Sequence, residues 1–142
     1  MYFSEMSFYS YYLKKSLENV LNVGWLSEAG NFPKGEVSRG FIEKLGELLI
    51  SNHPADYKIN RIRGVHPCNI CKKRDFDNFH IGSCEILIPR NKEGFFFASP
   101  SMILHYVEEH GYAPPEDYIK AVMEVDMNVD FPAQKVFDSM IG

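Results

Sequence analysis

The chain has 142 residues, of which 45% are hydrophobic and 24% are charged, and its formal net charge is −4. This length and composition predict a single globular domain over residues 1–142 and exclude a disordered chain, because enough apolar surface is present to form a core. No apolar run approaches about 18 residues, and the N-terminus reads neither as basic nor as continuously apolar, so we expect a cytoplasmic protein with no membrane span and no signal peptide.

The N-terminal third is expected to contain two helices separated by a short strand. Aromatic and aliphatic residues recur with helical spacing near the N-terminus, which predicts a helix over about residues 4–19. Residues 23–26 (V-G-W-L) are a candidate buried strand, and Trp25 is expected to anchor the core. A second helix is predicted over residues 37–49, where apolar residues recur at intervals of three and four.

The middle of the chain is expected to form the sheet. Residues 59–65 alternate weakly between apolar and polar side chains and are a candidate edge strand. Two β-rich runs, at residues 84–89 and 94–98, flank the turn sequence R-N-K-E. This arrangement predicts a hairpin near residues 83–98.

Further helices are expected after the hairpin. Ser99 and Pro100 suit the N-cap and first position of a third helix, which Gly111 ends. The prolines at 114–115 begin a fourth helix, and a last short helix follows Pro132. Because helices and strands segregate without β-α-β alternation, we predict an α+β fold in which four to five helices pack on a small antiparallel sheet, made of the hairpin and one or two strands.

The main chemical signal is the pattern H-P-C-N-I-C at residues 66–71. A C-x-x-C spacing can bring the thiolates of Cys68 and Cys71 to one zinc ion in a tight turn. His105 and His110 lie on the third predicted helix with an H-x4-H spacing, which is within the range of zinc-finger ligand pairs. We therefore predict a structural zinc knuckle whose ligands are Cys68, Cys71, His105 and His110.

Alternatives remain open for these residues. His66, His80 and Cys84 are other candidate ligands, and the gap between the cysteine pair and the histidine pair is longer than in small zinc fingers. The two cysteines could instead be buried core thiols, His110 could cap its helix, and His105 could be a core histidine. A thioredoxin-like redox role is not favoured, because no suitable strand and helix frame the cysteine pair.

Charge is unevenly distributed along the chain. Residues 57–74 carry only basic charged side chains, whereas residues 116–138 are rich in acids. An acidic face suits fast association with a basic protein partner through complementary electric fields. Nucleic acid is not favoured as a partner, because the chain is acidic overall. The residues expected to bind the protein partner are Glu116, Asp117, Tyr118, Glu124, Asp126 and Asp130.

Five sequence blocks together resemble a family of small uncharacterised bacterial domains. The blocks are V-G-W-L at 23–26, F-P-K-G at 32–35, R-G-V-H-P-C-N-I-C at 63–71, I-G-S-C-E-I at 81–86 and F-A-S-P-S-M-I-L-H-Y-V-E-E-H-G-Y-A-P-P-E-D-Y-I at 97–119. The resemblance covers about residues 20–123 and leaves the N-terminal aromatic segment and the tail outside. It implies that the C-x-x-C block and the later H-Y-V-x-x-H-G-Y block pair in space, and it implies no activity.

The sequence contains no motif typical of zincins, of α/β-hydrolases, or of enzymes with phosphate loops or dinucleotide sites. Our hypothesis is therefore a non-enzymatic binding protein, most concretely an immunity protein that neutralises a bacterial toxin domain, such as a nuclease, by protein–protein contact. The alternative is a zinc-dependent enzyme or a nucleic-acid-binding module built on the C-x-x-C knuckle.

Overall fold

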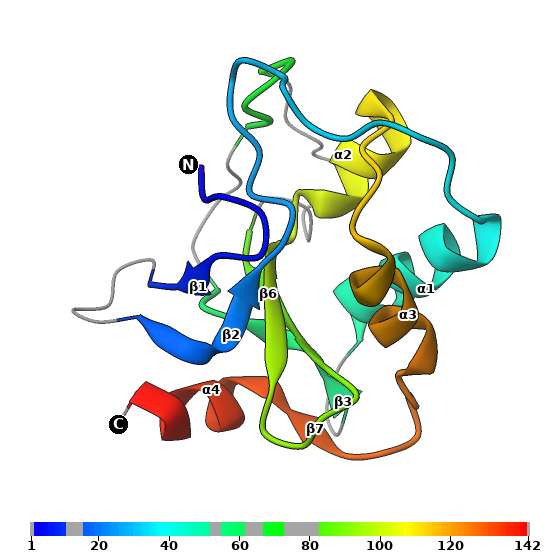
Figure 1. The fold of residues 1–142 in the computed structure, drawn as a ribbon. Helices are drawn as coiled ribbons and strands as arrows, with labels where there is room; N and C mark the ends of the chain where they lie inside the picture. The colour runs from blue at the N-terminus through cyan, green and yellow to red at the C-terminus, as the bar shows by residue number, and fades with distance from the viewer. Residues whose placement is uncertain (1, 11–15, 52–54, 62–66, 73–82, 142) are drawn as a thin grey trace.

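The structure, a computed structural model, describes residues 2–10, 16–51, 55–61, 67–72 and 83–141 (Figure 1). Its fold is α+β, as predicted. The strands are β1 (Phe8–Tyr9), β2 (Leu17–Asn22), β3 (Ala55–Asp56), β4 (Lys58–Ile59), β5 (Glu85–Pro89), β6 (Phe96–Pro100) and β7 (Phe131–Pro132). The helices are α1 (Arg39–Ile50), α2 (Ile103–His110), α3 (Glu116–Glu124) and α4 (Ala133–Ile141).

The main sheet has the strand order β1-β2-β6-β5-β4. β5 and β6 form the predicted hairpin, in which Leu87 lies opposite Ala98. However, β2 runs parallel to β6, so the prediction of an antiparallel sheet is wrong at this pairing. Parallel neighbours need a long crossover connection, and the chain between β2 and β6, which contains α1 and β5, supplies it. A separate pair, β3 and β7, is also parallel.

The predicted helix over residues 4–19 is wrong, because the described part of this segment forms β1 and the start of β2. Aromatic and β-branched side chains favour strands when they can pack on a sheet. Tyr9, Leu17 and Val20 do so here, since all three are buried in one core cluster. Tertiary packing therefore overrides the helical spacing of these residues.

Residues 23–26 are buried but are not a strand. β2 ends at Asn22, and Gly24 has a φ of 83°, a left-handed conformation that a strand does not contain. Trp25 is nevertheless a core anchor, as predicted, because it is 6% exposed. Its indole N–H donates to the carbonyl of Ala98 over 3.0 Å.

Three of the four described helices begin close to where the sequence places them. The side chain of Ser38 accepts a hydrogen bond from the N–H of Phe41 and caps α1. α3 follows the prolines at 114–115, and α4 follows Pro132. Of the candidate edge strand at 59–65, only Ile59 belongs to a described strand, and residues 62–66 lie outside the described part of the chain.

The predicted helix N-cap at Ser99 is wrong. β6 continues to Pro100, and α2 begins at Ile103. The Ser99 hydroxyl instead donates to the hydroxyl of Tyr118 over 3.0 Å, in the core. The other end of α2 is as predicted, because Gly111, with a φ of 67°, ends the helix.

Helices cover both faces of the main sheet (Figure 1). Ile86, Ile88 and Phe97 are buried in a cluster with side chains of α1, α2 and α3. Leu87 belongs to a second cluster with Phe137 of α4. Because successive side chains of a strand point to opposite faces, β5 needs the continuous apolar run that the sequence shows.

Within the described part of the chain, no helix has both the length and the apolar character that crossing a membrane requires.

Candidate metal centre

Residues 67–72 form a tight turn around the sulfur of Cys68. The N–H of Lys72 donates to the carbonyl of Cys68 over 2.9 Å, and Lys72 has a φ of 61°. The backbone nitrogens of Ile70 and Cys71 lie 3.3 and 3.5 Å from Sγ of Cys68. N–H groups directed at a sulfur favour its thiolate form. The two N–H groups therefore offset part of the opposite effect of burial on the pKa of Cys68.

The turn packs on the segment that follows β2. The side-chain amide of Asn69 donates to the carbonyl of Leu26 over 3.2 Å. An ion pair of 3.4 Å joins Lys72 to Glu28, but both side chains are exposed and such pairs contribute little. The V-G-W-L segment therefore contacts the C-x-x-C turn through the carbonyl of Leu26.

Helix α2 presents both predicted histidines to this turn. His105 lies in the first turn of α2, and His110 is its last residue. Nε2 of His105 lies 3.4 Å from Sγ of Cys71, and Nε2 of His110 lies 3.4 Å from Sγ of Cys68. The pairing of the two sequence blocks in space is therefore confirmed.

The four ligand atoms lie within 4.8 Å of one another. In a tetrahedral site with Zn–S of about 2.3 Å and Zn–N of about 2.0 Å, a sulfur and a nitrogen ligand are separated by about 3.5 Å. The observed S···N distances of 3.4 Å match this separation. Two sulfurs and two imidazole nitrogens are also a donor set that zinc prefers, and four protein ligands are typical of structural sites.

The centre is largely shielded from solvent. Cys68 is fully buried, and the other three residues are partly buried. Burial raises the pKa of the Cys68 thiol overall, although the N–H groups of Cys71 and Ile70 lower it in part. Burial and the neighbouring Cys68 also raise the pKa of Tyr106 to about 12, so this hydroxyl is neutral at ordinary pH.

The alternative ligands divide into two groups. His66 and His80 lie outside the described residues. Cys84 is buried just before β5 and is not part of the cluster found among the described residues. Its backbone N–H donates to the hydroxyl of Ser101, and its carbonyl accepts from the N–H of Ser101. Cys84 is thus a buried core thiol, and burial raises its pKa.

The predicted partner-binding residues lie on α3 and the loop that follows it. Five of them are exposed acids, namely Glu116, Asp117, Glu124, Asp126 and Asp130. The prediction for Tyr118 is wrong, because its side chain is fully buried and cannot contact a partner. Its ring packs edge-on against Phe97, with a centroid distance of 5.5 Å.

A polar network that no sequence motif indicated lies on the α4 face of the sheet. The Tyr9 hydroxyl donates to Oε1 of Glu85 over 2.8 Å, and the side-chain amide of Asn60 donates to Oε2 over 3.0 Å. Burial raises the pKa of Glu85 to about 7, although these two hydrogen bonds lower it. The sequence feature that could have indicated this network is Glu85 itself, an acid at the start of a continuously apolar strand.

Comparison with known proteins identifies a family for this chain, but that family has no assigned activity. A family model described as a domain of unknown function, DUF7919, matches residues 1–123. The N-terminal segment therefore lies inside the similarity, and the boundary expected near residue 20 is wrong. Neither the curated proteins nor the solved structures include a match to the chain.

Proposed function

The chain belongs to this family of domains of unknown function, and we propose that it is a non-enzymatic binding protein completed by one structural zinc ion. The observation that carries the proposal is the convergence of Cys68, Cys71, His105 and His110 within 4.8 Å. Four protein ligands complete a tetrahedron and leave no coordination position for a substrate.

The role of zinc in this proposal is to join two distant segments. Residues 67–72 form a short turn between stretches outside the described residues, and α2 follows the hairpin. Zinc binding stabilises a folded chain because the unfolded chain does not hold the four ligands together. The metal would therefore fasten the turn to α2 and to the core beneath.

Native mass spectrometry of the reduced, untagged protein tests the metal. We expect one zinc ion per chain, and its removal by a chelator should lower the melting temperature. Cys68→Ser and His110→Gln should each abolish stoichiometric zinc binding. Cys84→Ser is the matched control, because Cys84 is buried but outside the cluster. A metal-free protein whose melting temperature does not respond to added zinc would contradict the proposal.

The enzyme and nucleic-acid alternatives have less support. A zinc enzyme keeps an open coordination position for water or substrate, whereas four side chains converge here. Zinc held by only three protein ligands would favour an enzyme. Salt-dependent binding of an oligonucleotide would favour a nucleic-acid module.

The partner-binding surface in this proposal is the exposed acidic side of α3 and the loop after it. Complementary charges accelerate association, so this surface suits a basic protein domain. An immunity protein that neutralises a basic toxin domain, such as a nuclease, fits these requirements. Lys120 interrupts this surface and lies 4.0 Å from Glu124. The acids of the surface other than Glu124 are therefore the stronger candidates for docking.

A toxin-like reading frame beside the gene would supply the partner for a direct binding test. We expect Asp117→Lys combined with Asp130→Lys, two exposed acids of this surface, to slow association about tenfold or more at low salt. The matched control is Glu18→Lys combined with Glu93→Lys, which makes the same charge change at exposed acids outside α3 and its following loop. An equal effect of both pairs would exclude the acidic surface. Failure of every neighbouring gene product to bind would exclude the immunity function and leave the zinc centre untouched.

A further inference from the structure

A second charged site lies between β4 and the start of α4, away from the cysteines and histidines of the metal centre. It is an open cleft of about 480 Å³, which is within the size range of small-ligand sites. The residues that carry its chemistry are Asp56, Lys58, Asn60 and Arg61 on one wall and Gln134 and Lys135 on the other.

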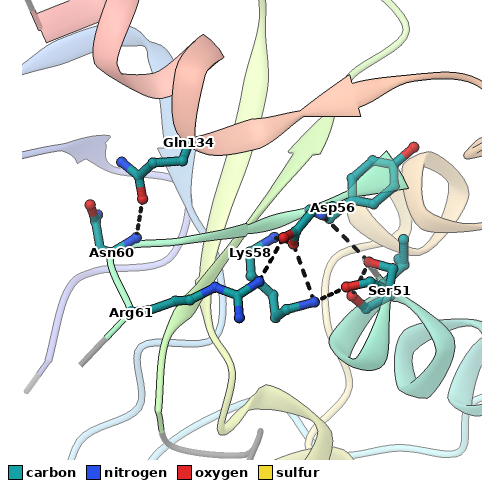
Figure 2. Close-up of polar contacts among 8 residues, drawn as sticks. Ser51, Asp56, Lys58, Asn60, Arg61 and Gln134 are labelled. Carbon is teal, nitrogen blue, oxygen red and sulfur yellow. Dashed lines mark hydrogen bonds and ion pairs between the residues drawn. The ribbon is translucent and has the colours of Figure 1, made fainter. Parts of the chain in front are cut away.

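Lys58 provides a fixed positive charge to this cleft. Its side chain is only 2% exposed, and Nζ lies 3.2 Å from Oδ1 of Asp56. The ammonium also donates to the carbonyl of Ser51, the residue that follows α1 (Figure 2). A buried ammonium needs such partners, and the carbonyl end of a helix favours a cation.

Arg61 shares the same carboxylate from a more exposed position. Its Nη2 lies 2.6 Å from Oδ2 of Asp56 (Figure 2). Of its side chain, 54% is accessible to solvent. Burial raises the pKa of Asp56, but hydrogen bonds and charge from Lys58, together with Arg61, lower it overall. Asp56 is therefore ionised and already paired. This contact uses only part of the guanidinium's five N–H donors.

The first turn of α4 forms the opposite wall. The side chain of Gln134 accepts a hydrogen bond of 2.7 Å from the backbone N–H of Asn60, which holds the two walls together (Figure 2). Asn60 has a φ of 51°, an uncommon conformation for a residue other than glycine. Lys135 is exposed, and within the described part of the chain no ion pair is recorded for it.

We propose that this cleft binds the oxyanion of a small molecule, a phosphate or a carboxylate group. The lining residues Lys58, Arg61 and Lys135 carry three positive charges against the single carboxylate of Asp56, so the lining is positive although the chain has a net charge of −4. The next carboxylates, Glu85 and Asp138, accept hydrogen bonds from the side chains of Asn60 and Gln134. Arg61 and Lys135 would contact the anion from the two walls. The buried ammonium of Lys58 would contribute positive charge close to the anion without contacting it. The site is independent of the metal centre and of the acidic surface on α3.

Isothermal titration of the zinc-loaded protein tests this site with inorganic phosphate, adenosine monophosphate and succinate as probes. At least one probe should bind saturably, and amide NMR signals of Asn60 and Gln134 should shift. Arg61→Gln and Lys135→Gln should each weaken binding about tenfold or more, because each removes a charged hydrogen-bond donor. Arg39→Gln and Lys120→Gln, exposed cations on α1 and α3, are the matched controls and should change nothing.

The probes also separate the two kinds of oxyanion. Binding of phosphate and the nucleotide but not succinate would assign the cleft to phosphate groups, and the reverse would assign it to carboxylates. Arg61→Gln also removes the ion pair with Asp56 and so could unfold the protein. Lys135→Gln breaks no such pair and therefore tests the site even in that case. Absence of saturable binding by all three probes, or equal weakening by the control variants, would overturn the proposal.

Discussion

Glu85 is a carboxylate that the fold keeps away from water. It is 7% exposed, and burial raises its pKa from 4.5 to about 7 despite the hydrogen bonds from Tyr9 and Asn60. The strand β5 imposes this position, because both faces of the strand are covered by helices. The cost of ionising Glu85 should therefore be visible in the stability of the whole protein.

Glu85 should make folding stability fall as the pH rises. A folded pKa above the unfolded value means that its contribution is fully present below about pH 4.5 and is lost as the pH passes about 7. The upper limit of the loss is about 3 kcal/mol. Urea unfolding across this range should show wild type losing stability relative to Glu85→Gln. A parallel profile for the two proteins would contradict the prediction, and Glu18→Gln, at an exposed acid on β2, is the control.

Gly24 is required by both its conformation and its surroundings. It has a φ of 83°, and an added Cβ would lie 2.8 Å from Cδ1 of Ile103. Gly24→Ala should lower the free energy of unfolding by about 2 kcal/mol or more.

Gly46, in the middle of α1, is the matched control, because no atom lies within 4 Å of a Cβ added there. Gly46→Ala should raise stability by up to about 1 kcal/mol, and urea unfolding of both variants checks the pair. Equal effects of the two substitutions would contradict this account.

At the scale of elements, α4 is the layer that closes one face of the sheet. Its Phe137 is fully buried, and the ring packs edge-on against Tyr9 with a centroid distance of 5.5 Å. The family match ends at residue 123, before this helix. In this chain the helix nevertheless completes a core cluster that contains residues of β1, β2, β5 and β6.

Removal of the Phe137 ring should destabilise the protein strongly. Phe137→Ala should lower the free energy of unfolding by about 3–5 kcal/mol, because it removes buried apolar contacts and leaves a cavity. Ile141→Ala is a control in the same helix, since Ile141 is 40% exposed and should cost much less. Chemical denaturation measures both. Similar losses for the two variants would mean that α4 does not cover the sheet as described.

At the scale of the whole molecule, the metal centre lies at the edge of a core that has other sources of stability. Cys68 belongs to the larger apolar cluster, but none of the four ligands takes part in the pairing of β5 with β6 or in the cluster that α4 completes. We therefore expect zinc removal to loosen one part of the molecule and to leave the sheet intact.

Hydrogen exchange before and after chelation tests this expectation. Protection should fall in residues 67–72 and in α2, while the amides of β5 and β6 should remain protected. Cys84→Ser should show the same response to chelation as the wild type. A loss of protection throughout the sheet would instead mean that zinc is needed for the entire fold.

The local patterns of the sequence predicted much of the fold. The apolar stripe of α1, the turn between β5 and β6, and the prolines before α3 and α4 are short-range signals, and each element was found close to its predicted place. The helix predicted over residues 4–19 was wrong, because aromatic residues with helical spacing can equally pack on a sheet. Strand β1 pairs with the nearby β2, but β2 in turn pairs with β6, and Tyr9 packs on Phe137 of α4, so the segment depends on residues far away in the chain.

The candidate ligands of the metal centre follow from local sequence patterns, since C-x-x-C and H-x4-H are spacings within a turn and within a helix. The folded chain was needed to show that these two pairs meet and that Tyr118 is buried. It was also needed to show that Lys58 and Arg61 share Asp56 in a cleft against α4. The physical reason is that a spacing records neighbours along the chain, whereas burial and long-range contacts depend on how the sheet brings distant segments together.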